Sequence, residues 1–481
     1  MDGLRLLLPE LGLSVMALLL MACDLFFDAR RGKVLMGFGF VAAGVALGSL
    51  GLAYNAPDTY QGLGTLWAVD PLGLYFKAII LAATVFALML SVDYKSPDAI
   101  RHPGSFTALV LLSAVGQMFL VSATDLLLIF LSLELVSISS FVLVGYERRD
   151  LKSSEGAMKY FLFGAFSSAI LVYGISLMYA ALGGTSLIDI APAMDRGVST
   201  SFVVGCVMLA VGFGFKVSMA PFHFWVADAY EGAPTPVTAY LSIAPKAAAL
   251  AVMLRVFTHL IPHTSLDLQG IFAFMAFLTM TVGNLTALFQ TNVKRLLAYS
   301  SIAQAGYLLI GFVTGDTIGR EGLLMYAMVY VFMNLGAFTV AMAVGNEDGY
   351  ELEAFDGLAR RSLGLALLMA FFLLSLAGIP PMAGFIGKFA LFAAAVKGGY
   401  WFLAVTAVLN SVVSVYYYMS VVYHMFFKAP RTLEPARTDV LMTGTLAVAA
   451  VGVLVIGLYP EPFLAAAKLS ADMLPAVSSH P

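Results

Sequence analysis

Long apolar runs alternate with short polar connections from one end of the chain to the other. A helix needs roughly 20 mostly apolar residues to cross the hydrocarbon core of a bilayer, and runs of that kind recur along the whole sequence. We therefore predict an all-α, polytopic membrane protein with about fourteen transmembrane helices. The expected spans are residues 4–26, 34–54, 72–92, 104–121, 124–146, 156–182, 200–228, 235–258, 269–289, 294–314, 321–345, 362–396, 400–427 and 439–459.

Two of these spans are too long for one straight helix. The seventh, at 200–228, contains "KVSMAPFHFW", and the twelfth, at 362–396, contains "GIPPMAG". Proline lacks a backbone donor and its ring clashes with the preceding turn, so it breaks or kinks a helix interior. The sequence therefore predicts broken helices in the seventh and twelfth spans.

The two predicted breaks occupy matching places along the chain. Spans five to eight and spans ten to thirteen form two blocks of four. The broken span is the third in each block. The blocks are five spans apart, so they would enter the membrane in opposite directions. Paired broken helices in inverted halves are typical of an ion or substrate site near the middle of the membrane.

Composition agrees with a membrane protein and excludes several other classes. Of 481 residues, 60% are hydrophobic and only 11% charged, whereas about a quarter of a soluble domain is charged. The net charge of −3 gives no basic surface for nucleic acid. Cys23 and Cys206 lie far apart in apolar runs, and the chain has no HExxH motif and no dinucleotide fingerprint. We expect no redox centre and no metal site on this chain.

The positions of lysine and arginine predict the orientation. Fifteen of the 26 lie in loops on one predicted side and six on the other, while five lie within spans. Loops rich in lysine and arginine stay in the cytoplasm. Both termini are therefore expected outside the cytoplasm, and the apolar N-terminal stretch is expected to be the first span instead of a cleaved signal.

Four charged residues lie near the middle of expected spans. They are Glu134, Lys216, Lys246 and Lys388. A charge at the centre of a bilayer costs on the order of 3 kcal/mol and usually faces a protein interior or a wet cavity. Snorkelling explains a lysine near a helix end, but these four lie about two or more turns from the nearest loop. We interpret them as functional residues.

The residue types indicate proton transfer. In general, burial disfavours a charged amine and a nearby carboxylate favours it, so a lysine that gains and loses a carboxylate neighbour gains and loses affinity for a proton. Glu134 with Lys216 is a plausible switching pair, and Lys246 with Lys388 would continue the relay. Three polar side chains that either line such a path or serve only helix packing are Gln304, Tyr299 and Tyr307.

Other charged residues allow a structural and a functional interpretation alike. Lys159 lies one turn into its span and could snorkel, and Lys77 is similar, with Asp70 nearby as a possible partner. His223 lies beside the first break and is either a core histidine or a relay residue, since histidine titrates near neutral pH. His424 is expected to mark the boundary of span thirteen.

Several long motifs resemble a known family. "KVSMAPFHFWVADAYEGAPTPVTAYLSIAPKAAAL" (216–250) and "NVKRLLAYSSIAQAGYLLIG" (292–311) are similar to the antiporter-like subunits of proton-pumping NADH:quinone oxidoreductase, respiratory complex I. "LLPELGL", "YFLFGAFSSAILVYGISLMY", "SLAGIPPMAGFIGKF" and "VIGLYPEPF" look like the subunit N branch of that family. The resemblance covers nearly the whole chain.

The resemblance implies a detailed architecture. It implies a single integral membrane domain, 1–481, of fourteen helices. Two inverted five-helix repeats would occupy 104–258 and 269–427, with helices seven and twelve broken. The functional positions of the family fall on Glu134, Lys159, Lys216, Lys246 and Lys388. Lysine at the last of these fits subunit N, because subunit M would carry glutamate there.

The resemblance also implies function and partners. The chain would translocate protons in the bacterial inner membrane, with both termini on the periplasmic side. It would carry no cofactor, while NADH, FMN, iron–sulfur clusters and quinone would bind to other membrane and peripheral subunits of complex I. The alternatives are a subunit of a multisubunit Na⁺/H⁺ antiporter, a subunit of a homologous ferredoxin-, F420H₂- or hydrogenase-linked complex, and an unrelated transporter with a polar substrate pocket.

Overall fold

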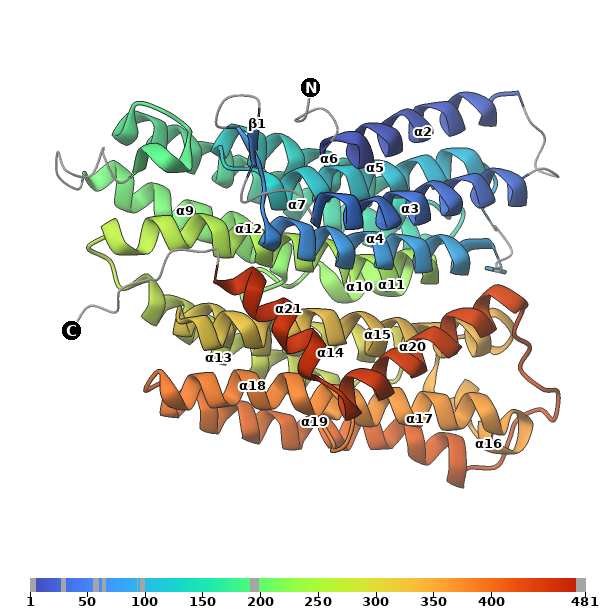
Figure 1. Ribbon diagram of the computed structural model, residues 1–481. Coiled ribbons are helices and arrows are strands. Elements are labelled where there is room, and N and C mark those ends of the chain that lie inside the picture. Colours follow the sequence, from blue (N-terminus) through green and yellow to red (C-terminus); the bar gives the residue numbers. More distant parts are fainter. Residues whose placement is uncertain are drawn as a thin grey trace.

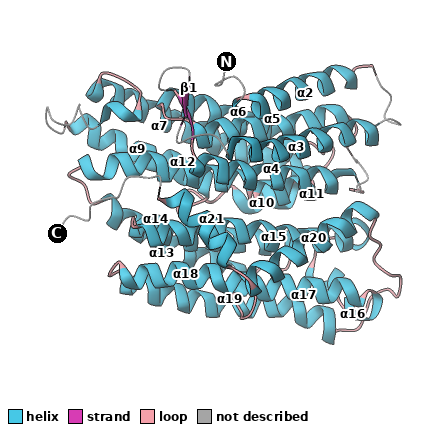
Figure 2. Cartoon of the chain, viewed as in Figure 1, coloured by secondary structure: helices cyan, strands magenta, loops and turns pink. Residues whose placement is uncertain are grey.

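The structure is a computed structural model that describes residues 6–26, 32–54, 60–62, 66–92, 94–95, 100–190 and 199–472. These residues are helical almost throughout (Figure 1). Figure 2 shows the small antiparallel hairpin of β1 (Tyr60–Gly62) and β2 (Trp67–Val69) among the helices. The expected all-α, polytopic fold class is confirmed.

The first helices form a layer along the edge of the bundle, drawn in blue in Figure 1. They are α2 (Leu8–Asp24), α3 (Gly32–Tyr54), α4 (Pro71–Val92) and α5 (Pro103–Ser122). Both α4 and α5 begin at proline, whose missing N–H has no partner to lose in the first turn of a helix. The Asp24 carboxylate at the end of α2 accepts hydrogen bonds from the backbone N–H groups of Gly104 and Ser105. This contact caps α5 and fixes α2 beside it.

The next helices extend from the cyan to the green part of the bundle in Figure 1. They are α6 (Leu126–Val144), α7 (Leu151–Leu182), η2 (Leu187–Asp189), α9 (Thr200–Val217), α10 (Val226–Gly232), α11 (Thr235–Leu241), α12 (Ala244–Leu260) and η3 (Ile261–His263). Side chains of Asp125, Asp150 and Ser199 accept hydrogen bonds from first-turn N–H groups. These N-caps explain why α6, α7 and α9 begin where they do.

The following helices form the opposite half of the bundle, from yellow to orange in Figure 1. They are α13 (Leu268–Ala287), α14 (Val293–Thr314), α15 (Thr317–Asp348), η4 (Leu352–Phe355), α16 (Leu358–Arg361), α17 (Leu363–Ala377), α18 (Ala383–Lys397) and α19 (Trp401–Phe427). Asp267, Asn292 and Asp316 cap the first three of these helices in the same way.

The last two helices connect the halves. They are α20 (Val440–Leu458) and α21 (Glu461–Ala471). In Figure 1, α21 crosses the face of the bundle obliquely, and it packs against both α15 and α4. The Ser470 hydroxyl donates to the carbonyl oxygen of Pro71 at 3.3 Å, which joins the end of α21 to the start of α4.

The number of full-length spans differs from the expected fourteen. Within the described residues, twelve helices are long and apolar enough to cross a membrane. The two remaining expected spans are present as shorter helices. α2 has 17 residues, and the twelfth span is divided into α17 and α18, with 15 residues each. The break within the twelfth span therefore accounts for one difference and the short α2 for the other, and the count of fourteen stays a prediction.

Burial places the core at the centre of the bundle. The apolar windows of α14 and α15 are 94% and 89% buried, but those of α7 and α20 only 33%. The outer helices present large apolar side chains to the surroundings, such as Phe166 and Val440, which are 70% and 86% exposed. An apolar outer surface of this extent suits contact with lipid. The chain is a multi-pass membrane protein.

Candidate functional site

Lys216 lies in the last turn of α9, directly before the first break. α9 ends at Val217, and Ser218 adopts a left-handed conformation with φ of 70°. The chain then runs through a non-helical segment until α10 begins at Val226. The Lys216 side chain is buried, with 7% of the residue exposed. A cation in this position also faces the negative end of the helix dipole, which favours it.

Glu134 and Lys216 share one region, although they form no direct ion pair. The Lys216 ammonium donates to the hydroxyl of Ser137 at 2.5 Å, and Ser137 lies one turn after Glu134 on α6. The Glu134 carboxylate accepts a hydrogen bond from Ser168 on α7, also at 2.5 Å. Glu134 is half-buried. The expected pair is brought together, with Ser137 between its members.

Lys246 lies at a break that the sequence did not predict. The eighth expected span consists of two helices, because α11 ends at Leu241 and α12 begins at Ala244. Pro245 lies in the first turn of α12, where it cannot donate to a preceding turn. Lys246 follows it directly, and its ammonium donates to the hydroxyl of Ser301 at 2.8 Å and to the Ser301 carbonyl at 3.2 Å. The residue is 4% exposed.

Lys388 lies in the second turn of α18, just after the break in the twelfth span. α17 ends at Ala377, and Gly378 follows in a left-handed conformation with φ of 89°. The Lys388 ammonium donates to the Ala377 carbonyl at 3.1 Å and to the Ser411 hydroxyl at 3.2 Å. It also lies 4.6 Å from the centre of the Tyr307 ring. The amine therefore binds a carbonyl that the helix break leaves without a helical partner.

Aromatic rings fill the region between Lys216 and Lys246. The Lys216 ammonium lies 5.3 Å from the centre of the Phe215 ring, and Phe215 packs against Trp225 at 5.2 Å. Trp225 in turn contacts Tyr230 at 6.2 Å, and the Lys246 ammonium lies 5.6 Å from that ring. This row of rings, Phe215, Trp225 and Tyr230, is called the aromatic section below.

Polar side chains fill the region between Lys246 and Lys388. Ser300, next to the serine that binds Lys246, hydrogen-bonds to the Tyr418 hydroxyl at 2.5 Å. The Gln304 amide donates to Tyr418 at 3.3 Å and to the Leu376 carbonyl at 3.2 Å. Leu376 directly precedes the residue whose carbonyl binds Lys388. These groups, Ser300, Tyr418, Gln304 and the Leu376 carbonyl, form what is called the polar section below.

Lys159 belongs to a separate ionic network at one end of the bundle. Its members are Lys152, Glu155, Lys159, Asp228, Glu231 and Arg295. The Lys159 ammonium contacts Asp228 at 2.6 Å, and Arg295 bridges Asp228 and Glu231 at 2.6 and 2.7 Å. Burial raises the pKa of Glu231, but hydrogen bonds from Lys152 and Arg295 outweigh it and hold that pKa below its usual value. The Lys159 side chain is 39% exposed and lies in the third turn of α7.

The two histidines of interest have different surroundings. His223 lies within the break between α9 and α10, stacks on Phe224, and is 8% exposed. Its Nδ1 atom is buried and has no hydrogen-bond partner in the described residues. His424, near the end of α19, contacts the Asp356 carboxylate at 2.6 Å. This position agrees with the expected boundary of span thirteen.

The expected pairing of Lys77 with Asp70 is wrong. Lys77 on α4 contacts Glu10 on α2 at 2.6 Å, and both side chains are fully buried. Asp70 instead accepts two hydrogen bonds from Arg255 of α12, at 2.6 and 2.9 Å. The guanidinium matches both carboxylate oxygens, which the single ammonium of Lys77 cannot do. Neither partner could be predicted from the local sequence, because both lie on other helices.

The described residues contain no group of three or more histidine, cysteine, aspartate or glutamate side chains arranged to hold a metal ion. The sequence did not single out the hydroxyl groups that bind the lysines or join the residues between them. Ser137, Ser301, Ser411 and Tyr418 are uncharged, and such residues are frequent in helix interfaces within membranes. Nothing in their local sequence distinguishes them from packing residues.

Comparison with known proteins gives one family. Residues 123–414 match the family model described as "NADH:quinone oxidoreductase/Mrp antiporter, TM". All four predicted mid-membrane charges, from Glu134 to Lys388, lie within the matched residues. A protein of Trichlorobacter lovleyi named NADH-quinone oxidoreductase subunit N is 41% identical to this chain, over 98% of each sequence.

Solved structures show the same fold. A chain of respiratory complex I from Thermus thermophilus with bound aureothin is 32% identical, with a TM-score of 0.81, over 96% of this chain and 99% of that one. A chain of the Mrp complex from Dietzia sp. is 19% identical, with a TM-score of 0.87, over 97% of each chain. The second likeness concerns the fold alone.

Proposed function

The chain belongs to the NADH:quinone oxidoreductase/Mrp antiporter family of membrane proteins, and from this premise we propose that it is the proton-translocating subunit N of a bacterial NADH:quinone oxidoreductase. The resemblance seen in the sequence motifs is confirmed. Relatives named subunit N, at about 40% identity over nearly the full length, support this assignment.

The observation that carries the proposed function is the row of buried charges across the bundle. Glu134, Lys216, Lys246 and Lys388 lie on α6, α9, α12 and α18. Buried charges in a membrane are costly, and they are retained where ions or protons pass. The lysines bind hydroxyls and carbonyls, and no carboxylate lies within 4.0 Å of any of them among the described residues. Such an amine can release its proton without breaking an ion pair.

The proposed mechanism follows from these contacts. A carboxylate near an amine favours the ammonium form, and separation of the two favours the neutral amine. Movement of Glu134 toward or away from Lys216 would therefore load or release a proton there. The polar section would pass the proton between Lys246 and Lys388 through hydroxyl and amide groups, which can both donate and accept.

The aromatic section would act as the barrier of the same pathway. Phe215 has no polar side-chain atom, and Trp225 and Tyr230 donate to the backbone carbonyls of Phe215 and Leu241. A proton passing from Lys216 to Lys246 would require these rings to move apart and admit water. Such a step would couple proton transfer to a conformational change that redox chemistry drives in other subunits.

The remaining assignments complete the proposal. The chain resides in the bacterial inner membrane, with both termini on the periplasmic side. Other membrane and peripheral subunits bind NADH, FMN, iron–sulfur clusters and quinone, and this chain binds none of them. The inverted repeats at 104–258 and 269–427 remain part of the proposal. They are supported by the left-handed residues Ser218 and Gly378, one after α9 and one after α17.

The test is proton pumping by the assembled complex. Lys216→Ala or Glu134→Ala should lower NADH-driven pumping in inverted membrane vesicles by about tenfold or more, the scale of losing a positioned proton-transfer group. Assembly is checked on native gels. Lys397→Ala, which removes an exposed lysine at the end of α18, should pump like the unaltered complex. Unchanged pumping in both buried-site variants would contradict the proposed role.

Purification distinguishes the other family members. Subunits that carry flavin and iron–sulfur clusters should co-purify with this chain, together with NADH:quinone activity. Co-purification with antiporter subunits alone would instead indicate a Na⁺/H⁺ antiporter. A donor-specific subunit for ferredoxin, F420H₂ or hydrogen would indicate a homologous complex.

A further inference from the structure

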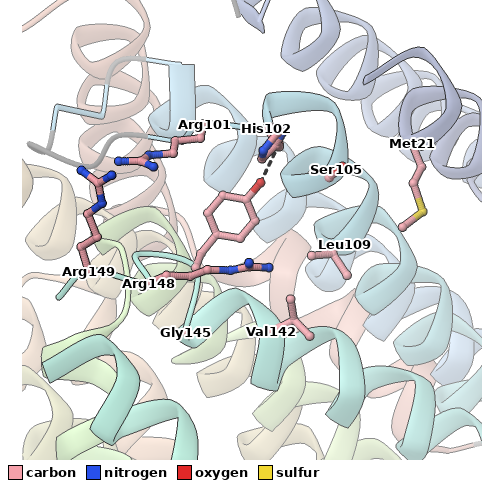
Figure 3. A pocket seen from close by; sticks show the side chains of 10 residues that line it. Met21, Arg101, His102, Ser105, Leu109, Val142, Gly145, Arg148 and Arg149 are labelled. Atoms are coloured by element: carbon pink, nitrogen blue, oxygen red, sulfur yellow. Dashed lines mark hydrogen bonds between the residues drawn. The ribbon is translucent and has the colours of Figure 1, made fainter. Parts of the chain in front are cut away.

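A cavity of about 630 Å³ has a lining that includes none of the charges in the row described above, and Figure 3 shows the side chains that form it. It is formed by the end of α2, the start of α5, and the connection between α6 and α7. The lining residues are Met21, Arg101, His102, Ser105, Leu109, Val142, Gly145, Tyr146, Arg148 and Arg149. None of the functions discussed above uses this cavity.

One wall of the cavity is basic. Three arginines and a histidine line it, and its described lining contains no aspartate or glutamate. Two carboxylates adjoin Arg148 and Arg149 in the chain, those of Glu147 and Asp150. On α2, the Asp24 carboxylate accepts hydrogen bonds from the N-terminus of α5 and from the Ser105 hydroxyl at 2.6 Å. His102 lies 3.7 Å from the same carboxylate. The charge of this wall therefore complements an anionic ligand.

The other wall is apolar and opens outward. Met21 and Val142 are 45% and 47% exposed on the outer faces of α2 and α6, and Leu109 lies between them on α5. In Figure 3 the Arg148 side chain extends across the cavity toward Leu109 and Val142. Basic groups at a helix end and an apolar wall along the adjacent helices match the two parts of a phospholipid, a charged headgroup and acyl chains.

The cavity is held open by a defined contact. The Tyr146 hydroxyl donates to the His102 carbonyl at 2.6 Å, shown as the dashed line in Figure 3, and its ring packs edge-on against Phe106 at 5.0 Å. These contacts join the α6–α7 connection to the start of α5. Figure 3 shows Arg149 beside Arg101, while the Arg148 side chain extends into the cavity.

We propose that this cavity binds one anionic phospholipid of the phosphatidylglycerol type. Its phosphate would lie against Arg148, Arg149 and Arg101, and an acyl chain would follow Met21, Leu109 and Val142. Guanidinium groups match phosphate oxygens in pairs, and basic pockets between helices on the cytoplasmic side of a membrane bind anionic headgroups. The arginines lie in loops on the side predicted to be cytoplasmic. The lipid site does not depend on the proposed pumping function.

The test is a count of bound lipid on this subunit. The purified complex is equilibrated with micelles that contain phosphatidylglycerol or phosphatidylcholine with identical acyl chains, and native mass spectrometry counts the lipids on the released subunit. The double variant Arg148→Gln, Arg149→Gln should bind phosphatidylglycerol about 25-fold more weakly, from about fivefold for each arginine near the surface. Pumping is measured separately, so a failure of one proposal does not affect the other.

Two further variants separate charge from shape. Lys428→Gln with Arg437→Gln removes two exposed charges on the same predicted side, far along the chain from the cavity, and should retain the lipid. Val142→Trp fills the apolar wall with every charge intact and should displace the lipid. Added inorganic phosphate should not displace it, because phosphate lacks acyl chains.

Several results would overturn the proposal. They are equal retention of phosphatidylcholine, unchanged binding in the arginine variant, equal loss in the Lys428 and Arg437 control, displacement by inorganic phosphate, and retention in Val142→Trp. Density for a neighbouring subunit within the cavity of the assembled complex would also overturn it.

Discussion

The three buried lysines have similar immediate surroundings. Each ammonium donates to a serine hydroxyl, of Ser137, Ser301 or Ser411, at 2.5 to 3.2 Å. Each also lies within 6 Å of an aromatic ring centre, a distance at which a cation is attracted to the ring. These neutral partners can stabilise the ammonium and still leave the amine free to lose its proton.

Lys388 provides the most direct test of this arrangement. Lys388→Ala should lower NADH-driven pumping by about tenfold or more, because it removes the proton carrier at the end of the polar section. Lys388→Arg should retain part of the activity, since it keeps a cation but releases its proton much less readily. Pumping rate and assembly are measured in the same vesicles. Normal pumping by Lys388→Ala would mean that the break in span twelve is only structural.

Tyr418 tests the polar section with a neighbouring control. Tyr418→Phe removes the hydroxyl between Ser300 and Gln304, and we expect pumping to fall by about tenfold or more. Tyr417→Phe removes an equally buried hydroxyl that donates to Asn284 at 3.0 Å. This control should pump nearly normally. Similar losses in the two variants would show that buried hydroxyls matter here only for stability.

At the residue scale, the sequence identified the charges but not their partners. Glu134, Lys216, Lys246 and Lys388 were predictable because a charge within an apolar run is costly and stands out. The serines and Tyr418 were not predictable, because they lie on other helices and because placing a hydroxyl group in a helix interface within the membrane costs little free energy. The wrong partner expected for Lys77 has the same cause.

At the scale of helices, each buried lysine lies at an interruption. Lys216 lies in the last turn of α9, Lys246 in the first turn of α12, and Lys388 in the second turn of α18. Interrupted helices leave carbonyl and N–H groups without helical partners, so polar side chains can be accommodated there at lower cost. Two interruptions were predictable from span length and proline. The third was not, because "SIAPKAAAL" is short enough to look like an ordinary span with proline near its start.

Gly378 tests the connection between a break and its lysine. Its φ of 89° costs an alanine roughly 1–2 kcal/mol, and a Cβ there would lie 2.9 Å from Cδ of Lys388. Gly378→Ala should therefore displace the amine and lower pumping, with a smaller effect on assembly. Gly364→Ala, within α17 and with no atom within 4 Å of the added Cβ, should pump normally. Pumping and thermal stability of both variants are compared. Equal pumping and equal thermal stability of the two variants would show that the backbone at Gly378 does not control the position of Lys388.

At the scale of the molecule, two buried ion pairs join the first helices to the rest. Glu10 with Lys77 connects α2 to α4, and Asp70 with Arg255 connects the start of α4 to α12. Burial alone would raise the pKa of Asp70, but the charge and hydrogen bonds of Arg255 lower it by more. The pKa of Asp70 therefore lies below its usual value. The second pair lies on an element that also carries a buried charge of the row, because Arg255 and Lys246 are both on α12.

Asp70→Asn should destabilise the subunit by about 3–5 kcal/mol, the scale for leaving a buried charge without its partner. Asp439→Asn, which breaks an exposed pair with Lys95, should cost about 0–1 kcal/mol. Thermal unfolding of the solubilised complex measures both. Because the folded pKa of Asp70 is lowered, its contribution is complete above about pH 4 and is lost as the pH falls through the folded pKa. An equal effect of the two variants would contradict the structural role of Asp70.

The places of most helices along the chain were predictable, and the docking of helices was not. Apolar length predicts spans because lipid acts on each helix separately, and the orientation expected from the charge asymmetry stays a prediction. Packing of α21 against α15 and α4, by contrast, depends on surfaces that are far apart in the chain. No local pattern encodes such a contact.

The ion pair of Asp70 and Arg255 has a consequence for biogenesis. The two residues are 185 positions apart, so at ribosomal speeds of about 5–20 residues per second the aspartate is made on the order of 10–40 s before its arginine. During that interval the backbone N–H of Gly73 is its remaining hydrogen-bond donor. Asp70 therefore gains its ion pair only after α12 has been synthesised, so the contact between the start of α4 and α12 forms late in biogenesis.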